Sequence, residues 1–133
     1  MPSAPISPYG LQKATAESYC RLYYPLYGLP TVALRYFNVF GPRQDPTSDY
    51  AAVVPAFITA VKAQRPPTIF GDGEQTRDFT FIGNVVEANL QACRAEQPAL
   101  GRAFNVACGT RISLNELVGQ IAELARLRRL PGC

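Results

Sequence analysis

Hydrophobic and polar positions follow a helical period over residues 9–27, where apolar residues form two stripes, as in a helix packed between other elements. Ser7 is a residue type that caps helix starts, and Pro8 suits the first helical position. Gly28 is typical of a helix end. Because an interior proline removes a backbone hydrogen bond, we expect the last turn to bend or unwind at Pro25.

A near-continuous apolar run over residues 31–38 predicts the next element. It is rich in strand-forming residues, and such runs are typical of strands covered on both faces in a parallel sheet. Functional side chains in these sheets gather at the carboxyl ends of strands. Tyr36, Phe37 and Asn38 are therefore candidate site residues.

The remaining pattern predicts three further strands, two helices opened by capping boxes and one helix without such a signal. The capping boxes are Asn84 with Glu87 and Ser113 with Glu116. In order, the predicted elements are a helix over 51–65, short strands over 68–70 and 77–82, a helix over 84–95, a strand over 103–107 and a helix over 113–127. Helices that alternate with short strands indicate the α/β class.

Composition narrows the functional classes. The net charge is +3 without a long basic run, which argues against nucleic-acid binding but favours anionic small molecules. Histidine is absent, which excludes histidine-dependent hydrolase triads and argues against a metal site of the usual zinc type. No apolar stretch approaches the roughly 18 residues of a membrane span, so we expect no membrane association.

The cysteines predict the compartment. Four cysteines are scattered without a Cys-x-x-Cys pair. Three of them lie in apolar helical or strand-like settings, which favours buried, reduced thiols. We therefore expect a cytosolic protein.

Tyr9 and Lys13 form the first candidate catalytic pair. They lie four residues apart and share one face of the predicted helix. A phenol is a poor base at neutral pH unless a nearby cation favours its anion, and an ammonium on the same face supplies that cation. The same spacing occurs by chance in many helices, so the pair gains meaning only from the residues that follow it.

Four ordered blocks of sequence carry a resemblance to a known family. They lie at residues 9–13, 34–43, 71–79 and 104–109. Together they resemble the extended short-chain dehydrogenase/reductase family, specifically its NAD-dependent nucleotide-sugar epimerases and dehydratases. Residues 43–46, 50–55 and 110–117 most closely resemble UDP-N-acetylglucosamine 4-epimerases. UDP-glucose 4-epimerases and dTDP-glucose dehydratases share the outer blocks.

The resemblance implies a base and a cofactor site. Tyr9 matches the catalytic base, and Lys13 matches the residue that assists it and binds the nicotinamide ribose. Tyr36 and Phe37 match positions that line the nicotinamide pocket, so the implied cofactor is NAD.

The resemblance also implies a site for a UDP-sugar substrate. The matching residues are Asn38, Ala52, Val53, Thr68, Phe70 and Arg77. Arg77 matches the arginine that binds the diphosphate, for which a planar guanidinium is well suited. Structural alternatives remain for the others: Asn38 as a turn residue, Ala52 as an ordinary helix residue and Phe70 as a core residue.

The implied reaction is 4-epimerisation through transient oxidation to a 4-keto sugar and re-reduction. The family's glycine-rich dinucleotide fingerprint is not found in the sequence, and Gly71 and Gly73 lack the third glycine and the helix that a phosphate cradle needs. We therefore expect the C-terminal part of a Rossmann-like fold, without the N-terminal dinucleotide-binding half and inactive alone.

The expected organisation is one partial domain. Residues 1–48 and 101–112 resemble the last strands and helix of the Rossmann sheet, and residues 49–100 and 113–133 resemble the substrate-binding region. The resemblance further implies a homodimer that uses the helix bearing Tyr9. Three alternatives stay open: a stand-alone sugar-nucleotide-binding module, part of a dTDP-sugar 4,6-dehydratase, and a non-catalytic assembly domain.

Overall fold

The computed structural model describes residues 4–45 and 53–127. These residues form two compact units, which are described separately. Unit 1 comprises the chain up to Tyr36 together with Asn84–Val106, and unit 2 comprises Phe37–Gly83 together with the chain from Ala107 onward. The predicted ranges differ from these units in two ways. They group residues 84–100 with the substrate-binding region, and they group residues 37–48 and 107–112 with the Rossmann sheet.

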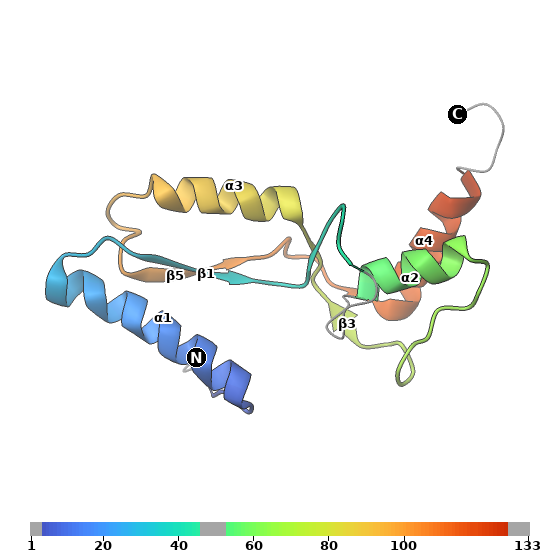
Figure 1. The fold of residues 1–133 in the computed structure, drawn as a ribbon, viewed down its shortest axis with the longest axis horizontal. Helices are drawn as coiled ribbons and strands as arrows, with labels where there is room; N and C mark the ends of the chain where they lie inside the picture. The colour runs from blue at the N-terminus through green and yellow to red at the C-terminus, as the bar shows by residue number, and fades with distance from the viewer. Residues whose placement is uncertain (1–3, 46–52, 128–133) are drawn as a thin grey trace. The chain divides into compact units, whose positions relative to one another are not determined.

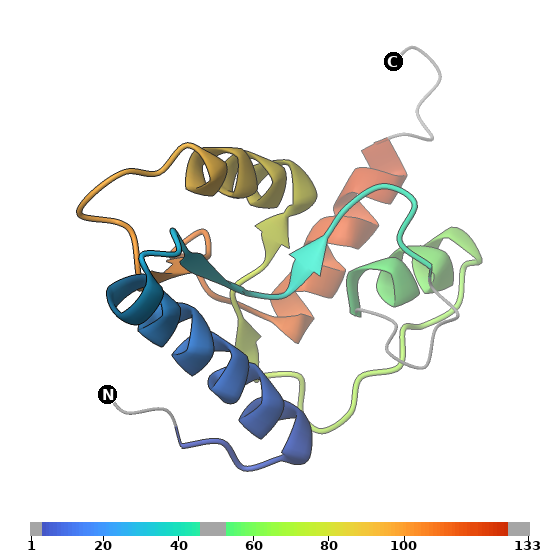
Figure 2. The same cartoon turned by 60° about the vertical axis from the view of Figure 1, so that its left-hand side comes forward.

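Unit 1 has three layers, helix, sheet and helix. Strands β1 (Val32–Tyr36) and β5 (Arg102–Val106) pair in parallel, with Val32 opposite Arg102. Helices α1 (Pro8–Tyr27) and α3 (Ile82–Cys93) lie on opposite faces of this pair (Figures 1 and 2). The α/β class is thus confirmed, and β1 is the strand predicted within residues 31–38.

Both ends of α1 form as the sequence predicts. The Ser7 hydroxyl accepts a hydrogen bond from the Gly10 amide at 3.1 Å. At the other end Gly28 adopts the left-handed conformation (φ 66°) and its amide donates to the Tyr24 carbonyl at 2.9 Å. The expected unwinding at Pro25 is wrong, because the helix continues to Tyr27. Only Leu26 and Tyr27 follow the proline in the helix, and the Gly28 cap ends it.

An ion pair connects α1 to β1. The Arg35 guanidinium donates from Nε and Nη2 to the two carboxylate oxygens of Glu17, each at 2.6 Å. This bidentate geometry is the strong form of a charge-assisted hydrogen bond. Arg21 lies on the same carboxylate at 4.0 Å.

Unit 2 contains two small sheets and two helices. Strands β2 (Val39–Phe40) and β4 (Thr80–Phe81) pair in parallel, whereas β3 (Thr76–Arg77) and β6 (Ile112–Ser113) pair antiparallel. Helices α2 (Val53–Lys62) and α4 (Leu114–Leu127) supply its hydrophobic core. The buried core residues are Val54, Phe57, Leu114 and Leu117.

Several predicted boundaries in these segments are wrong. Residues 68–70 form no strand, and the predicted strand over 77–82 is replaced by β3 and β4. The expected capping box at Asn84 fails because α3 begins at Ile82, directly after β4. The box at Ser113 is confirmed, since the Ser113 amide donates to Glu116 Oε2 at 2.7 Å and the Glu116 amide to the Ser113 hydroxyl at 3.1 Å.

The expectation of buried thiols is also wrong in part. Cys20 is half-buried, whereas Cys93 and Cys108 are exposed, and all three are free thiols. Cys93 is the last residue of α3, and Cys108 follows β5 where the chain leaves the sheet. Within residues 4–45 and 53–127, no helix has the length and hydropathy to cross a bilayer.

The Glu17–Arg35 pair predicts a pH-dependent stability. The hydrogen bonds from Arg35, assisted by its charge, hold the pKa of Glu17 below its ordinary value of 4.5. A lowered folded-state pKa stabilises the fold above about pH 4.5, and this stabilisation is lost as the pH falls through the folded-state value. Arg35→Met should therefore lower the urea midpoint at pH 7 and have progressively less effect towards about pH 3.

Arg21→Met is the matched control, because Arg21 contacts the same carboxylate only at 4.0 Å. It should lower the midpoint less than Arg35→Met. An Arg35→Met effect that is equally large at neutral and acid pH would contradict this assignment.

Candidate functional site

Unit 1 carries the predicted base and three of the four predicted cofactor-binding residues. The Lys13 ammonium lies over the Tyr9 ring, 5.3 Å from its centroid, so the two side chains share one face of α1. Tyr9 is 69% exposed. The Tyr36 hydroxyl donates to Asn89 Oδ1 at 3.0 Å, which joins the end of β1 to α3. The fourth residue, Phe37, belongs to unit 2.

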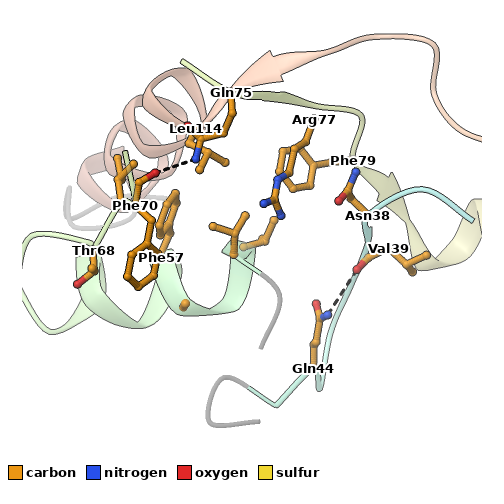
Figure 3. Close-up of a pocket in the computed structure, with 14 residues that line it drawn as sticks. Asn38, Val39, Gln44, Phe57, Thr68, Phe70, Gln75, Arg77, Phe79 and Leu114 are labelled. Carbon is orange, nitrogen blue, oxygen red and sulfur yellow. Dashed lines mark hydrogen bonds between the residues drawn. The ribbon is translucent and has the colours of Figure 1, made fainter. Parts of the chain in front are cut away.

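Unit 2 contains a pocket of about 590 Å³ that gathers the predicted substrate residues (Figure 3). Five of the six predicted residues line it, namely Asn38, Val53, Thr68, Phe70 and Arg77. The sixth, Ala52, lies outside the described residues. The pocket lies wholly within unit 2, so its geometry requires no residue of unit 1.

The two ends of the pocket differ in chemistry. Figure 3 shows Thr68 and Phe70 at one end, next to the wall formed by Phe57. At the other end Arg77 points into the cavity beside Asn38. One end therefore offers an aromatic surface, and the other offers a guanidinium with several hydrogen-bond donors.

Phe70 is not a core residue. Its side chain is 83% exposed, which excludes the structural alternative. The Gln75 side chain holds the backbone at Phe70, because its Nε2 donates to the Phe70 carbonyl at 2.9 Å. An exposed aromatic ring that lines a pocket is available for contact with a planar ligand group.

At the Arg77 end of the pocket, Asp78 joins three segments of the chain through hydrogen bonds. Its carboxylate is 9% exposed and accepts hydrogen bonds from the backbone amides of Cys108 at 2.9 Å and Gly109 at 2.8 Å. The Asn38 amide nitrogen donates to the Asp78 carbonyl at 2.9 Å. Asn38 has a positive φ of 30°, so it serves as a turn residue and also lines the pocket. Arg77 directly precedes Asp78, so these bonds fix the backbone next to Arg77.

Gly73 has a packing role. A Cβ atom there would lie 2.2 Å from Asn115 Oδ1, and its φ of 78° favours glycine. The Asn115 amide nitrogen in turn donates to the Asp72 carbonyl at 3.0 Å and to Glu74 Oε1 at 2.6 Å. The space beside Gly73 is therefore filled by α4, in agreement with the rejection of this turn as a phosphate cradle.

Other pocket residues were not predicted as site residues. They include Gln44, Phe57, Gln75, Phe79 and Leu114. Phe57 belongs to the hydrophobic core of unit 2 as well as lining the pocket, and no local signal distinguishes the two glutamines. Gln44 Nε2 donates to the Val39 carbonyl at 3.4 Å, and its Oε1 is buried without a hydrogen-bond partner among the residues described.

The sequence matches a known protein family. Residues 1–107 match the NAD dependent epimerase/dehydratase family. The chain belongs to this family. A putative UDP-glucose 4-epimerase of Methanocaldococcus jannaschii is 45% identical over 116 residues, which cover 87% of this chain and 36% of that relative. The chain thus spans little more than a third of the length of this family member.

Solved structures of family members share the fold. The UDP-N-acetylglucosamine 4-epimerase of Methanobrevibacter ruminantium M1, in complex with UDP-N-acetylmuramic acid, is 44% identical with a TM-score of 0.86, covering 92% of this chain and 39% of that one. The UDP-glucuronic acid 4-epimerase of Bacillus cereus, in complex with UDP-glucuronic acid and NAD, is 32% identical with a TM-score of 0.78, covering 92% and 38%. The Rossmann-like epimerase fold expected from the sequence is confirmed.

The Asp78 interactions predict a specific loss of stability. Asp78→Asn keeps one acceptor oxygen but places an amide NH₂ against a backbone N–H, so about 2 kcal/mol of unfolding free energy should be lost. Urea unfolding measures this loss. Asp72→Asn is the control, because the exposed Asp72 carboxylate accepts a local bond from the Glu74 amide at 3.0 Å, and the bond from Asn115 goes to the Asp72 backbone carbonyl, which the substitution keeps; it should cost less than about 0.5 kcal/mol. Equal effects of the two substitutions would contradict the assignment.

Proposed function

We propose that this chain supplies the catalytic base and the nucleotide-sugar pocket of an NAD-dependent nucleotide-sugar 4-epimerase of the UDP-N-acetylglucosamine or UDP-glucose type. The observation that carries the proposal is the pocket in unit 2, which is lined by five residues that the family resemblance assigns to substrate binding. The names of the relatives described above agree with this substrate class.

The proposed ligand occupies the pocket from end to end. The uracil ring lies at Thr68 and Phe70, where an exposed aromatic side chain can contact it. The diphosphate lies at Arg77, whose planar fork of donors suits phosphate oxygens. Val53, which lines the pocket, borders the sugar, a role that the family resemblance also assigns to Ala52, and small residues there would leave room for an N-acetyl group.

The proposed base is Tyr9. Its ring and the Lys13 ammonium lie together on an exposed face of α1. Among the described residues Lys13 forms no ion pair, so its three donors suit the ribose hydroxyls of a dinucleotide. The aromatic side chains of Tyr36 and Phe37 suit the nicotinamide. These residues fit NAD, which when bound would supply reversible oxidation at C4 of the sugar.

The chain's own residues have three proposed roles in the reaction. Tyr9 accepts the proton of the sugar 4-hydroxyl and returns it at the end of the cycle, with Lys13 favouring its anionic form. Arg77 holds the diphosphate while the 4-keto sugar rotates in the pocket, which is a positioning role. Tyr36 and Phe37 exclude water from the reacting face.

The proposal includes a requirement for further polypeptide. The spaced-glycine fingerprint that binds a dinucleotide diphosphate is not found among the 133 residues. The chain alone should therefore not epimerise UDP-N-acetylglucosamine when NAD is added. In this view unit 1 belongs to a Rossmann sheet that further polypeptide completes, and unit 2 holds the substrate.

We further propose a homodimer in the cytosol. Helix α1 exposes a row of aromatic residues, in which the Tyr23 ring contacts the rings of Tyr19 and Tyr27 edge to face. Exposed apolar rows of this kind are typical of interfaces. A monomeric mass in light scattering at high protein concentration would contradict the dimer.

A second function deserves testing because the pocket lies within one unit. Since Thr68, Phe70 and Arg77 all belong to unit 2, nucleotide binding needs no residue of unit 1. The chain could therefore act as a stand-alone binding module for UDP-sugars. Both the epimerase part and the stand-alone module should bind UDP-sugars without turnover. Turnover after addition of a glycine-rich dinucleotide-binding half is expected only for the epimerase part.

The proposed pocket predicts which substitutions weaken nucleotide binding. Arg77→Gln should weaken UDP binding about tenfold or more, because charge-assisted hydrogen bonds to the diphosphate are lost. Phe70→Ala should weaken UDP and uridine alike. Isothermal titration calorimetry on the full chain measures both.

Arg126→Gln is the matched control, because Arg126 is an exposed arginine of the same unit that does not line the pocket. It should leave the affinity for UDP unchanged. If wild-type protein binds no UDP, or if Arg126→Gln weakens binding as much as Arg77→Gln, the proposed pocket is refuted.

A further inference from the structure

Helix α1 carries a row of charged side chains on the face that bears Tyr9. Lys13, Glu17 and Arg21 follow the tyrosine at intervals of four residues, so they lie one turn apart along this face. An acidic residue one turn from a lysine is a natural partner for its ammonium. Within residues 4–45 and 53–127, however, Lys13 forms no ion pair, and its Nζ lies over the Tyr9 ring, 5.3 Å from the centroid.

Strand β1 supplies the partner that Glu17 has instead. Arg35 donates from Nε to Glu17 Oε2 and from Nη2 to Oε1, each at 2.6 Å, so its fork occupies both carboxylate oxygens. Arg21 lies 4.0 Å from Oε1. The Glu17 side chain is only 18% exposed, and a carboxylate so far removed from water is stable only when it is paired.

We propose that Arg35 is a positioning residue for the proposed base, because it holds the Glu17 carboxylate and so leaves the Lys13 ammonium free to lie against Tyr9. The inference rests on the proposed function, in which Lys13 assists Tyr9. All of these residues belong to unit 1.

The loss of Arg35 would leave Glu17 Oε2 without its donor, since Arg21 contacts the other oxygen. Lys13, one turn away on the same face, carries the ammonium that can replace it. Tyr9 and Glu17 lie on opposite sides of Lys13 along the helix. A Lys13–Glu17 pair would therefore draw the ammonium away from the tyrosine ring.

The Glu17–Arg35 pair also stabilises the fold, so a loss of stability does not separate a positioning role from a structural one. Two substitutions separate them. Glu17→Gln and Arg35→Met remove the same ion pair, but only Arg35→Met leaves a free carboxylate one turn from Lys13. The two variants have a similar structural cost and opposite consequences for the ammonium.

Nuclear magnetic resonance of the lysine side chains in the full chain tests the inference. The sequence contains two lysines, Lys13 and Lys62, so a chain labelled with ¹³C-lysine gives two sets of ε-methylene signals. Protons held over an aromatic ring are shielded by it, and Tyr9→Leu gives the unshielded position of the Lys13 signal. Lys62 lies in α2 of unit 2 and is the internal reference.

At neutral pH, Arg35→Met should move the Lys13 signal more than about half of the way to its position in Tyr9→Leu. Glu17→Gln, alone or combined with Arg35→Met, should leave the signal at its wild-type position. Arg35→Lys keeps a cation on the carboxylate and should stay close to wild type. Arg21→Met is the matched control and should not move the signal, because Arg35 still occupies both oxygens.

Unchanged amide signals of β1 and β5 show that a variant is folded. If Arg35→Met does not fold, Arg35→Gln, which keeps a neutral hydrogen-bond donor, takes its place and should move the Lys13 signal in the same direction.

Two results would overturn the inference. One is a Lys13 signal that stays in place when Arg35 is replaced by an uncharged residue. The other is an equal displacement in Glu17→Gln, because loss of the ion pair rather than a free carboxylate would then move the ammonium. Both results leave the proposed function intact, since neither concerns the pocket of unit 2. The proposed function fails instead if the wild-type chain binds no UDP.

Discussion

The buried carboxylate of Asp78 is the constraint on which the site in unit 2 depends. Its two oxygens accept bonds from consecutive backbone amides some thirty residues further along the chain, at Cys108 and Gly109. Its carbonyl accepts a bond from the Asn38 side chain. One residue thus ties three segments together, and it fixes the backbone next to Arg77, which lines the pocket.

This arrangement separates recognition from chemistry along the sequence. The residues proposed to grip uracil and diphosphate belong to unit 2, whereas the Tyr9–Lys13 pair belongs to unit 1. Under the proposed function, binding energy from the nucleotide, which does not react, would position the sugar for reaction. Nucleotide binding and turnover would then be separate measurements.

The sequence predicted the features that depend on near neighbours. The Ser7 cap and the Ser113–Glu116 box involve residues at most three apart, and both form. The sequence did not predict the features that depend on contacts between distant segments. Residues 68–70 form no strand although their composition favours one, and β4 leads directly into α3 at Ile82. The role of Asp78 was missed because its partners lie thirty residues away. Only the family resemblance predicted that Thr68, Phe70 and Arg77 line one pocket.

Mapping UDP onto the isotope-labelled chain by two-dimensional ¹⁵N–¹H NMR tests the central claim most directly. The account predicts that the amide signals of Thr68–Phe70 and of Arg77 shift on addition of UDP, while those of α3 stay in place. Shifts confined to unit 1, or no shift at millimolar UDP, would contradict it.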